Sequence, residues 1–175
     1  GGGLISEPMA RLGSKVTGID ASKVNINIAK EHALQSELDI NYQAILAENL
    51  AKKPKKFQIV LALEVIEHVE NIELFVRTCC DLLKPGGLII FSTMNRTLKS
   101  FLESIIAAEY ILKWLPIGTH EWSKFVKPSE INQYADMNKM QLIEMKGLSY
   151  KILSRNWELS DDISNNFFMT YTKHS

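Results

Sequence analysis

The sequence predicts an α/β fold, a sheet flanked by helices. Helical and strand patterns alternate along the 175 residues, as in such folds. The near-continuous apolar runs at 57–63 and 88–93 are typical of strands buried on both faces. No internal repeat or low-complexity linker interrupts the chain. We therefore expect a single domain over residues 1–175, with an apolar helical insertion at 97–119.

Local capping signals set the limits of the elements. Gly13 is placed to end the first helix, and Ser22 and Asn71 can cap two further helices. The run 84–87 (KPGG) is expected to end the helix that Asn71 begins. The expected helices are 4–12, 23–36, 71–83, 97–115 and 128–137. The expected strands are 15–20, 40–45, 57–63, 88–93, 141–147 and 166–172, the last two forming a hairpin at the sheet edge.

The composition narrows the possible partners. Lys+Arg and Asp+Glu each number 20, so the net charge is zero, which argues against nucleic acid as a main partner. The hydrophobic (46%) and charged (23%) fractions are ordinary for a globular protein. The sequence contains no run of 18 apolar residues, so we expect no membrane span. Cys79 and Cys80 are adjacent in a predicted helix and are expected to be reduced, half-buried structural residues. The absence of CxxC spacing argues against a metal or redox pair.

The N-terminal segment resembles a nucleotide-type cofactor site. Gly1 and Gly3 belong to a glycine run that leads into a helix, and the next strand ends at Asp20. Glycines allow a ligand to approach the backbone, and the acid can accept hydrogen bonds from ribose hydroxyls. Asp20 could instead be a capping or turn acid. The glycines that lie one strand-and-helix unit earlier in the sequence favour the ribose role.

A second polar cluster follows the strand at 57–63. Glu64, Glu67 and His68 have i, i+3, i+4 spacing, which predicts one face of a helical turn. Two carboxylates and an imidazole can bind a divalent cation, or they can be a surface cluster without a ligand. The cluster follows the end of a strand at a predicted switch point of the sheet, where α/β folds bind ligands, and this position favours the ligand-binding interpretation. The carboxylates suit Mg²⁺, and Zn²⁺ could bind through His68.

Two further features concern the insertion. His120 follows it in a predicted loop and is a candidate for substrate contact or proton transfer. The insertion carries an apolar helical face, which can pack into the core or meet lipid or an oily substrate. Tyr110 and Trp114 lie near its end and suit an interface. Both interpretations stay open.

Several strings together resemble one family. They are GGGLISEPMARLGSKVTGID, EVIEHV, KPGGLIIFSTMNRT, AAEYILKWLPIGTHEWSKF and KPSE. The sequence is similar to the S-adenosylmethionine-dependent ubiquinone-biosynthesis O-methyltransferases, also called 3-demethylubiquinone 3-O-methyltransferases. The glycine, EVIEHV and KPGG strings occur loosely in other class I methyltransferases, whereas STMNRT with AEYILKWLPIGTH is far more specific. The resemblance covers essentially all 175 residues.

The resemblance implies a fold, a cofactor and a substrate class. The fold would be a Rossmann-like, seven-stranded sheet with one antiparallel strand near its edge. The cofactor would be S-adenosylmethionine, and the substrate a polyprenylated catechol-type ring. Carried over by position, the family's cofactor residues fall on Gly1, Gly3, Asp20 and Leu63. Its divalent-metal site falls on Glu64, Glu67 and His68, and its membrane-facing substrate lid falls on 97–119.

The family pattern also contains a first strand and a leading Asp-x-Gly-Cys, which this sequence does not show ahead of Gly1. We expect the sheet to separate into two pieces without that strand, and this stretch alone to be inactive and poorly folded. Unpaired buried backbone groups would cost about 1–3 kcal/mol each. Two alternatives to this O-methyltransferase stay open. One is an inactive fragment or scaffold remnant of such an enzyme, and the other is a methyltransferase acting on another small molecule.

The expected reaction is methyl transfer from the sulfonium carbon to a phenolic oxygen. A cation at Glu64, Glu67 and His68 could lower the phenol pKa, or His68 or His120 could act as general base. The sequence leaves both open. We expect a cytoplasmic enzyme that can lie on the inner membrane face, or a mitochondrial matrix enzyme in a eukaryote. Other quinone-synthesis enzymes are candidate partners.

Overall fold

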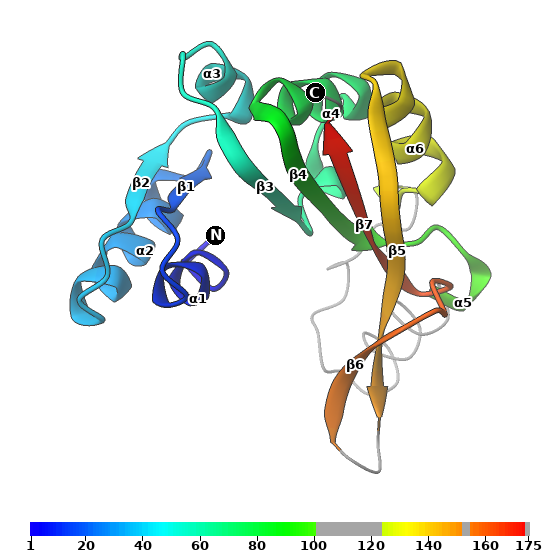
Figure 1. Cartoon of the computed structure of the whole chain (residues 1–175). Coiled ribbons are helices and arrows are strands. Elements are labelled where there is room, and N and C mark those ends of the chain that lie inside the picture. Colours follow the sequence, from blue (N-terminus) through cyan, green and yellow to red (C-terminus); the bar gives the residue numbers. More distant parts are fainter. Residues whose placement is uncertain (101–123, 152–154, 174–175) are drawn as a thin grey trace. The chain divides into compact units, whose positions relative to one another are not determined.

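The computed structural model describes residues 1–100, 124–151 and 155–173 (Figure 1). The chain divides into two compact units, Gly1–Pro54 and Lys55–Ser175. Each unit has its own sheet, and each is described by itself. The expectation of one domain stays a prediction.

The first unit is a small α/β layer built on two parallel strands. β1 pairs with β2 in register from Thr17 opposite Asn41 to Asp20 opposite Ala44. The Ser22 hydroxyl accepts a hydrogen bond from the Asn25 amide and caps α2, as predicted. A small core of α2 and β2 side chains holds the layer together: Ile26, Ala29, Ala33 and Tyr42. The elements are α1 (Ser6–Arg11), β1 (Thr17–Asp20), α2 (Lys23–Gln35), β2 (Asn41–Ala44) and α3 (Ala47–Ala51).

The second unit contains a five-stranded mixed sheet. Its strand order is β3-β4-β7-β5-β6. β3 and β4 are parallel, and β7 lies antiparallel between β4 and β5. The strands are β3 (Phe57–Leu63), β4 (Leu83–Met94), β5 (Met140–Lys151), β6 (Asn156–Ser160) and β7 (Asn166–Lys173), and the helices are the 3₁₀ turn η1 (Ile66–His68), α4 (Ile72–Asp81), α5 (Leu98–Ser100) and α6 (Pro128–Met137).

Helices α4 and α6 lie next to each other and pack against this sheet. Val76 of α4 and Ile131 of α6 are fully buried. Beneath them the rings of Phe91 on β4 and Tyr171 on β7 meet edge to face, with centroids 6.3 Å apart. Figure 1 shows β6 and the adjoining end of β5 extending away from these helices as a two-stranded ribbon. The sheet and two helices thus form a rigid platform for the carboxyl ends of β3 and β4.

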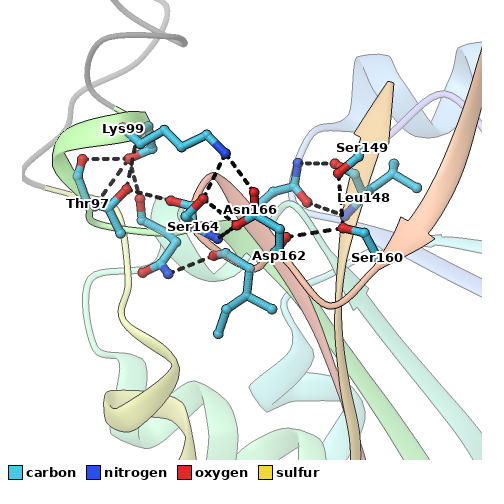
Figure 2. Close-up of polar contacts among 11 residues, drawn as sticks. Thr97, Lys99, Leu148, Ser149, Ser160, Asp162, Ser164 and Asn166 are labelled. Carbon is cyan, nitrogen blue, oxygen red and sulfur yellow. Dashed lines mark hydrogen bonds and ion pairs between the residues drawn. The ribbon is translucent and has the colours of Figure 1, made fainter. Parts of the chain in front are cut away.

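A polar network ties the segment after β4 to the loop before β7 (Figure 2). Asn95 donates through its side chain to the Ile163 carbonyl (2.9 Å), and its amide donates to the Asn165 carbonyl (2.8 Å). The Lys99 ammonium contacts Asp162 (2.7 Å) and the Ser164 hydroxyl (2.9 Å). The network fixes the position at which the chain leaves the sheet toward the insertion.

The structure confirms several predicted elements. The strand at 57–63 has the predicted bounds, and Asn71 and Pro128 begin helices as expected. The antiparallel strand that the family resemblance implied is β7. The strands also fall into two separate sheets, as expected. The reason we gave for that separation, an absent first strand, stays a prediction.

Other expectations were wrong. Among the described residues β3 is an edge strand, not a centre buried on both faces, and Ile59 is 47% exposed. The run 84–87 belongs to β4, where the pairing register shifts, because Gly86 can adopt a φ of +69°. Cys79 and Cys80 form no disulfide, and both are buried rather than half-buried. Two short elements, α3 and β6, were not predicted.

Candidate functional site

The glycine segment of the first unit is shaped by one aromatic side chain. Gly3 has a φ of +98°, and a Cβ there would lie 2.9 Å from the Tyr42 hydroxyl oxygen. Gly18 is paired with Tyr42 across β1 and β2, and a Cβ there would lie 2.6 Å from Tyr42 Cε1. Tyr42 itself is only 6% exposed. The ring therefore fills the space that both glycines leave, and neither position can take a larger residue without movement.

Asp20 lies at the end of β1 and faces this segment. Its carboxylate accepts hydrogen bonds from the Ser22 amide (2.7 Å), the Asn25 side-chain amide (3.2 Å) and the amino group of Gly1. Burial raises the pKa of Asp20, but the three donors outweigh it, so the pKa lies below its ordinary value. The structure thus places Gly1 beside Asp20, and the cofactor role of the two residues stays a prediction. It also gives Asp20 the turn-capping role that we had weighed as the alternative.

In the second unit, the end of β3 is held by Ser92 of β4. Leu63 pairs with Ser92, and the chain then turns at Glu64, whose φ is +52°. The Glu64 amide donates to the Ser92 carbonyl (3.0 Å) and lies 3.2 Å from its hydroxyl oxygen. The Ser92 hydroxyl donates in turn to Glu64 Oε1 (2.7 Å). One serine thereby fixes both the backbone and the carboxylate of the first acid, in a left-handed conformation that is uncommon outside glycine.

The second acid has a separate anchor. The Thr93 hydroxyl donates to Glu67 Oε2 (2.8 Å), and the Glu67 side chain is 10% exposed. His68 Nε2 lies 3.9 Å from Glu67 Oε1, beyond hydrogen-bond distance. The His68 side chain is 70% exposed. Glu67 is therefore held inside the unit while His68 faces solvent.

The predicted helical face of three ligands was wrong. The 3₁₀ turn covers only Ile66–His68, and Glu64 lies before it in a left-handed conformation. No group of three His, Cys, Asp or Glu side chains within the described ranges is arranged to hold a metal ion. Each carboxylate instead accepts a hydroxyl hydrogen bond from a different β4 residue. In this conformation Glu64, Glu67 and His68 do not fit a shared divalent cation.

Two predicted features lie outside the described residues. His120 is one of them, and the insertion at 97–119 is described only through α5. In the part of the chain that is described, no helix has the length and apolar character to cross a membrane.

Three residues that shape the site were not identified from the sequence. Ser92 and Thr93 lay within the string STMNRT, which we had used only as a sign of resemblance. Tyr42 had no signal at all, because its role depends on the pairing of β1 with β2.

Comparison with known proteins identifies the family. A family model described as a methyltransferase domain matches residues 1–91. A ubiquinone biosynthesis O-methyltransferase of Pelagibacter ubique is 47% identical over 174 residues, which are 99% of this chain and 72% of that protein. The chain belongs to the ubiquinone biosynthesis O-methyltransferase family. A member from Brucella anthropi is also 47% identical, over 97% of this chain and 68% of its own.

Solved structures agree on the fold. Magnesium protoporphyrin IX methyltransferase from Synechocystis, with bound S-adenosylhomocysteine, aligns with a TM-score of 0.68 over 99% of this chain and 70% of its own, at 16% identity. An S-adenosylmethionine-dependent methyltransferase from Clostridium acetobutylicum aligns over the whole chain and 81% of its own, with a TM-score of 0.72 at 11% identity. At such identities the likeness supports the fold alone. The chain of this O-methyltransferase family member has the class I methyltransferase fold that the sequence predicted.

Proposed function

We propose that this chain transfers a methyl group from S-adenosylmethionine to a phenolic hydroxyl of a polyprenylated, catechol-type ubiquinone precursor. One observation carries the proposal: curated proteins named ubiquinone biosynthesis O-methyltransferase are 47% identical over 97–99% of the chain. The names of those relatives give ubiquinone biosynthesis and O-methylation, and the polyprenylated catechol ring is what the family resemblance of the sequence implies. The geometry of the glycine segment and Asp20 is consistent with the cofactor.

The cofactor residues that we propose are Gly1, Gly3, Asp20 and Leu63. The positive φ of Gly3 lets the backbone turn where a ligand would approach closely. The Asp20 carboxylate is an acceptor beside Gly1, which is the chemistry that ribose hydroxyls require. Leu63 offers a partly buried apolar side chain at the end of β3. The glycine segment and Asp20, taken by themselves, suit the ribose of S-adenosylmethionine, whose sulfonium supplies an activated methyl group.

The protein must orient the phenol and accept its proton. Orientation of two reactants can contribute about 7–11 kcal/mol of the barrier. We propose His68 or His120 as the group that takes the proton. His68 is exposed and lies beside the Glu67 carboxylate, which would stabilise the imidazolium that forms. These roles are proposals that variants at the two histidines would separate.

Magnesium stays a prediction, and we assign no step to it. The Glu64 and Glu67 carboxylates each accept a hydroxyl hydrogen bond, from Ser92 and Thr93, and within the described residues no three His, Cys, Asp or Glu side chains are arranged to hold a metal ion. A chelator provides the direct test. Full activity in excess chelator would rule out an essential cation, whereas loss that Mg²⁺ restores would require a rearranged site.

Membrane contact is the last part of the proposal. The apolar insertion at 97–119 is proposed to meet the lipid or the prenyl chain of the substrate, at the inner face of a membrane. The support is its sequence alone. Tyr110 and Trp114 are amphipathic aromatic residues near the end of an apolar helical pattern, and such residues suit a membrane interface. Flotation of the protein with anionic vesicles tests it, and recovery only in the soluble fraction would contradict it.

The decisive experiment is calorimetric titration with S-adenosylhomocysteine, followed by a methyl-transfer assay. The assay would compare a prenylated catechol with the same ring lacking one of the vicinal hydroxyls. We expect cofactor binding that Asp20→Asn weakens, and methylation of the catechol. Methylation of a substrate without vicinal hydroxyls would favour another small molecule. Binding without transfer to any ring, or no binding, would favour the scaffold alternative.

A further inference from the structure

We propose that Ser92 and Thr93 are positioning residues that hold the Glu64 and Glu67 carboxylates on opposite faces of β4. The two acids then serve at separate places and are not ligands of one ion. The inference rests on the proposed methyltransferase function for its kinetic test, but its geometry comes from this chain alone.

Strand alternation places the Ser92 and Thr93 side chains on opposite faces of the sheet. Ser92 and Thr93 are consecutive residues of β4, paired with Phe168 and Phe167 of β7 in regular register. Successive side chains of a strand point to opposite faces of the sheet. The Ser92 hydroxyl donates to Glu64 (2.7 Å) and the Thr93 hydroxyl to Glu67 (2.8 Å). The two carboxylates are therefore drawn to opposite faces.

The Ser92 and Thr93 anchors are rigid. Ser92 is 1% exposed and Thr93 is fully buried. A hydroxyl has one proton to donate, and each donates it to a carboxylate, at 2.7 Å from Ser92 and 2.8 Å from Thr93. The branched Thr93 side chain also has a restricted χ1. Water cannot readily replace either hydroxyl, so each acid has one defined place.

The two carboxylates differ in their exposure to solvent and in their neighbours. Glu64 is exposed and follows Leu63, the proposed cofactor residue, so its carboxylate can meet donors on a bound reactant. Glu67 is largely buried and lies beside His68, so its place influences the orientation of the imidazole. Ser92 would thus affect reactant alignment, and Thr93 would act through Glu67 and His68.

The kinetic test uses isosteric and conservative pairs of variants. Ser92→Ala and Thr93→Val remove the hydroxyls, whereas Ser92→Thr and Thr93→Ser keep them. Thr172→Val on β7 is the matched control, because its hydroxyl makes a single long contact among the described residues, 3.4 Å from the Gly87 carbonyl. We expect kcat to fall about tenfold in each hydroxyl-free variant, with the KM for S-adenosylmethionine unchanged. The conservative variants and the control should stay close to wild type.

The pattern of the result distinguishes positioning from stability. A circular-dichroism melt of each variant shows whether it is folded. Folded Ser92→Ala and Thr93→Val enzymes with wild-type kcat would overturn the proposal. So would equal losses in the conservative variants, since they retain the donors.

A metal titration tests the separation of the acids independently of activity. Mn²⁺ is added to the full chain and followed by electron paramagnetic resonance, for wild type, Glu64→Gln and Glu67→Gln. We expect the same Mn²⁺ signal from all three. Ordered Mn²⁺ in wild type that both variants lose would overturn the proposal. A wild type that neither binds S-adenosylhomocysteine nor methylates would refute the proposed function, while this titration would still decide whether the acids share an ion.

Discussion

The glycine and Asp20 segment of the first unit and the acid pair of the second unit are built in opposite ways. Asp20 is held by Ser22 and Asn25, two and five residues along the chain. Glu64 and Glu67 are held by hydroxyls 28 and 26 residues away. The first arrangement depends on turns between residues close in sequence and on glycines, which have no side chain. The second depends on which strands lie side by side, and a substitution should therefore act differently in each region.

The largest stability effect is expected at Gly18. A Cβ there would lie 2.6 Å from Tyr42 Cε1, in the core of the first unit. Gly18→Ala should destabilise that unit by about 3 kcal/mol, the upper end for overpacking. Hydrogen exchange of amides in residues 1–54 measures it. Gly2→Ala is the control, because its nearest neighbour would be Ile28 at an ordinary 3.8 Å.

A double variant sharpens this prediction. Tyr42→Leu should relieve the contact, so its cost and that of Gly18→Ala should not add. Additive costs would mean that the ring is not what excludes a side chain at Gly18.

The next effect, about 2 kcal/mol, is expected at Asn95 in the second unit. Its buried side chain donates to the Ile163 carbonyl 68 residues away, and Asn95→Ala would leave that acceptor unsatisfied. Asn138→Ala is the matched control, since within the described part of the chain its side chain donates to the Tyr134 carbonyl of its own helix and to no other acceptor. Urea unfolding followed by circular dichroism compares them. Equal midpoints would remove the distinction between long-range and local hydrogen bonds.

A smaller effect is expected from Asp20, and it depends on pH. Because its pKa in the folded chain is lowered, the carboxylate stabilises the fold above its unfolded pKa of about 4. That stabilisation is lost as the pH falls through the folded pKa. The urea midpoint of wild type should therefore fall more steeply between pH 5 and pH 3, about the range of carboxyl titration, than that of Asp20→Asn. Parallel curves would show that the Asp20 hydrogen bonds do not differ between folded and unfolded states.

The same contrast explains what the sequence could predict. The strand 57–63 and the caps Ser22 and Asn71 follow from local chemistry, and the structure has them. The helical face of Glu64, Glu67 and His68 failed, because spacing cannot reveal a left-handed residue whose amide is bound by the neighbouring strand. Ser92 and Thr93 could be recognised as anchors only once β3 and β4 were known to pair in parallel.

The smallest effect is expected where a long-range contact is exposed. Lys99 reaches Asp162 and Ser164 across 63 and 65 residues (Figure 2), yet the Lys99 and Asp162 side chains are 45% and 53% exposed. Hydrogen bonds from Lys99 and Ser164 lower the pKa of Asp162. Solvent nevertheless screens such pairs. Lys99→Ala should shift the melting temperature slightly at low salt and not at about 1 M NaCl. The Asn95→Ala shift should persist in both. A Lys99→Ala shift that survived in high salt would mean that burial does not explain why the two contacts differ in cost. The number of residues between the partners would then have to explain the cost of Asn95→Ala.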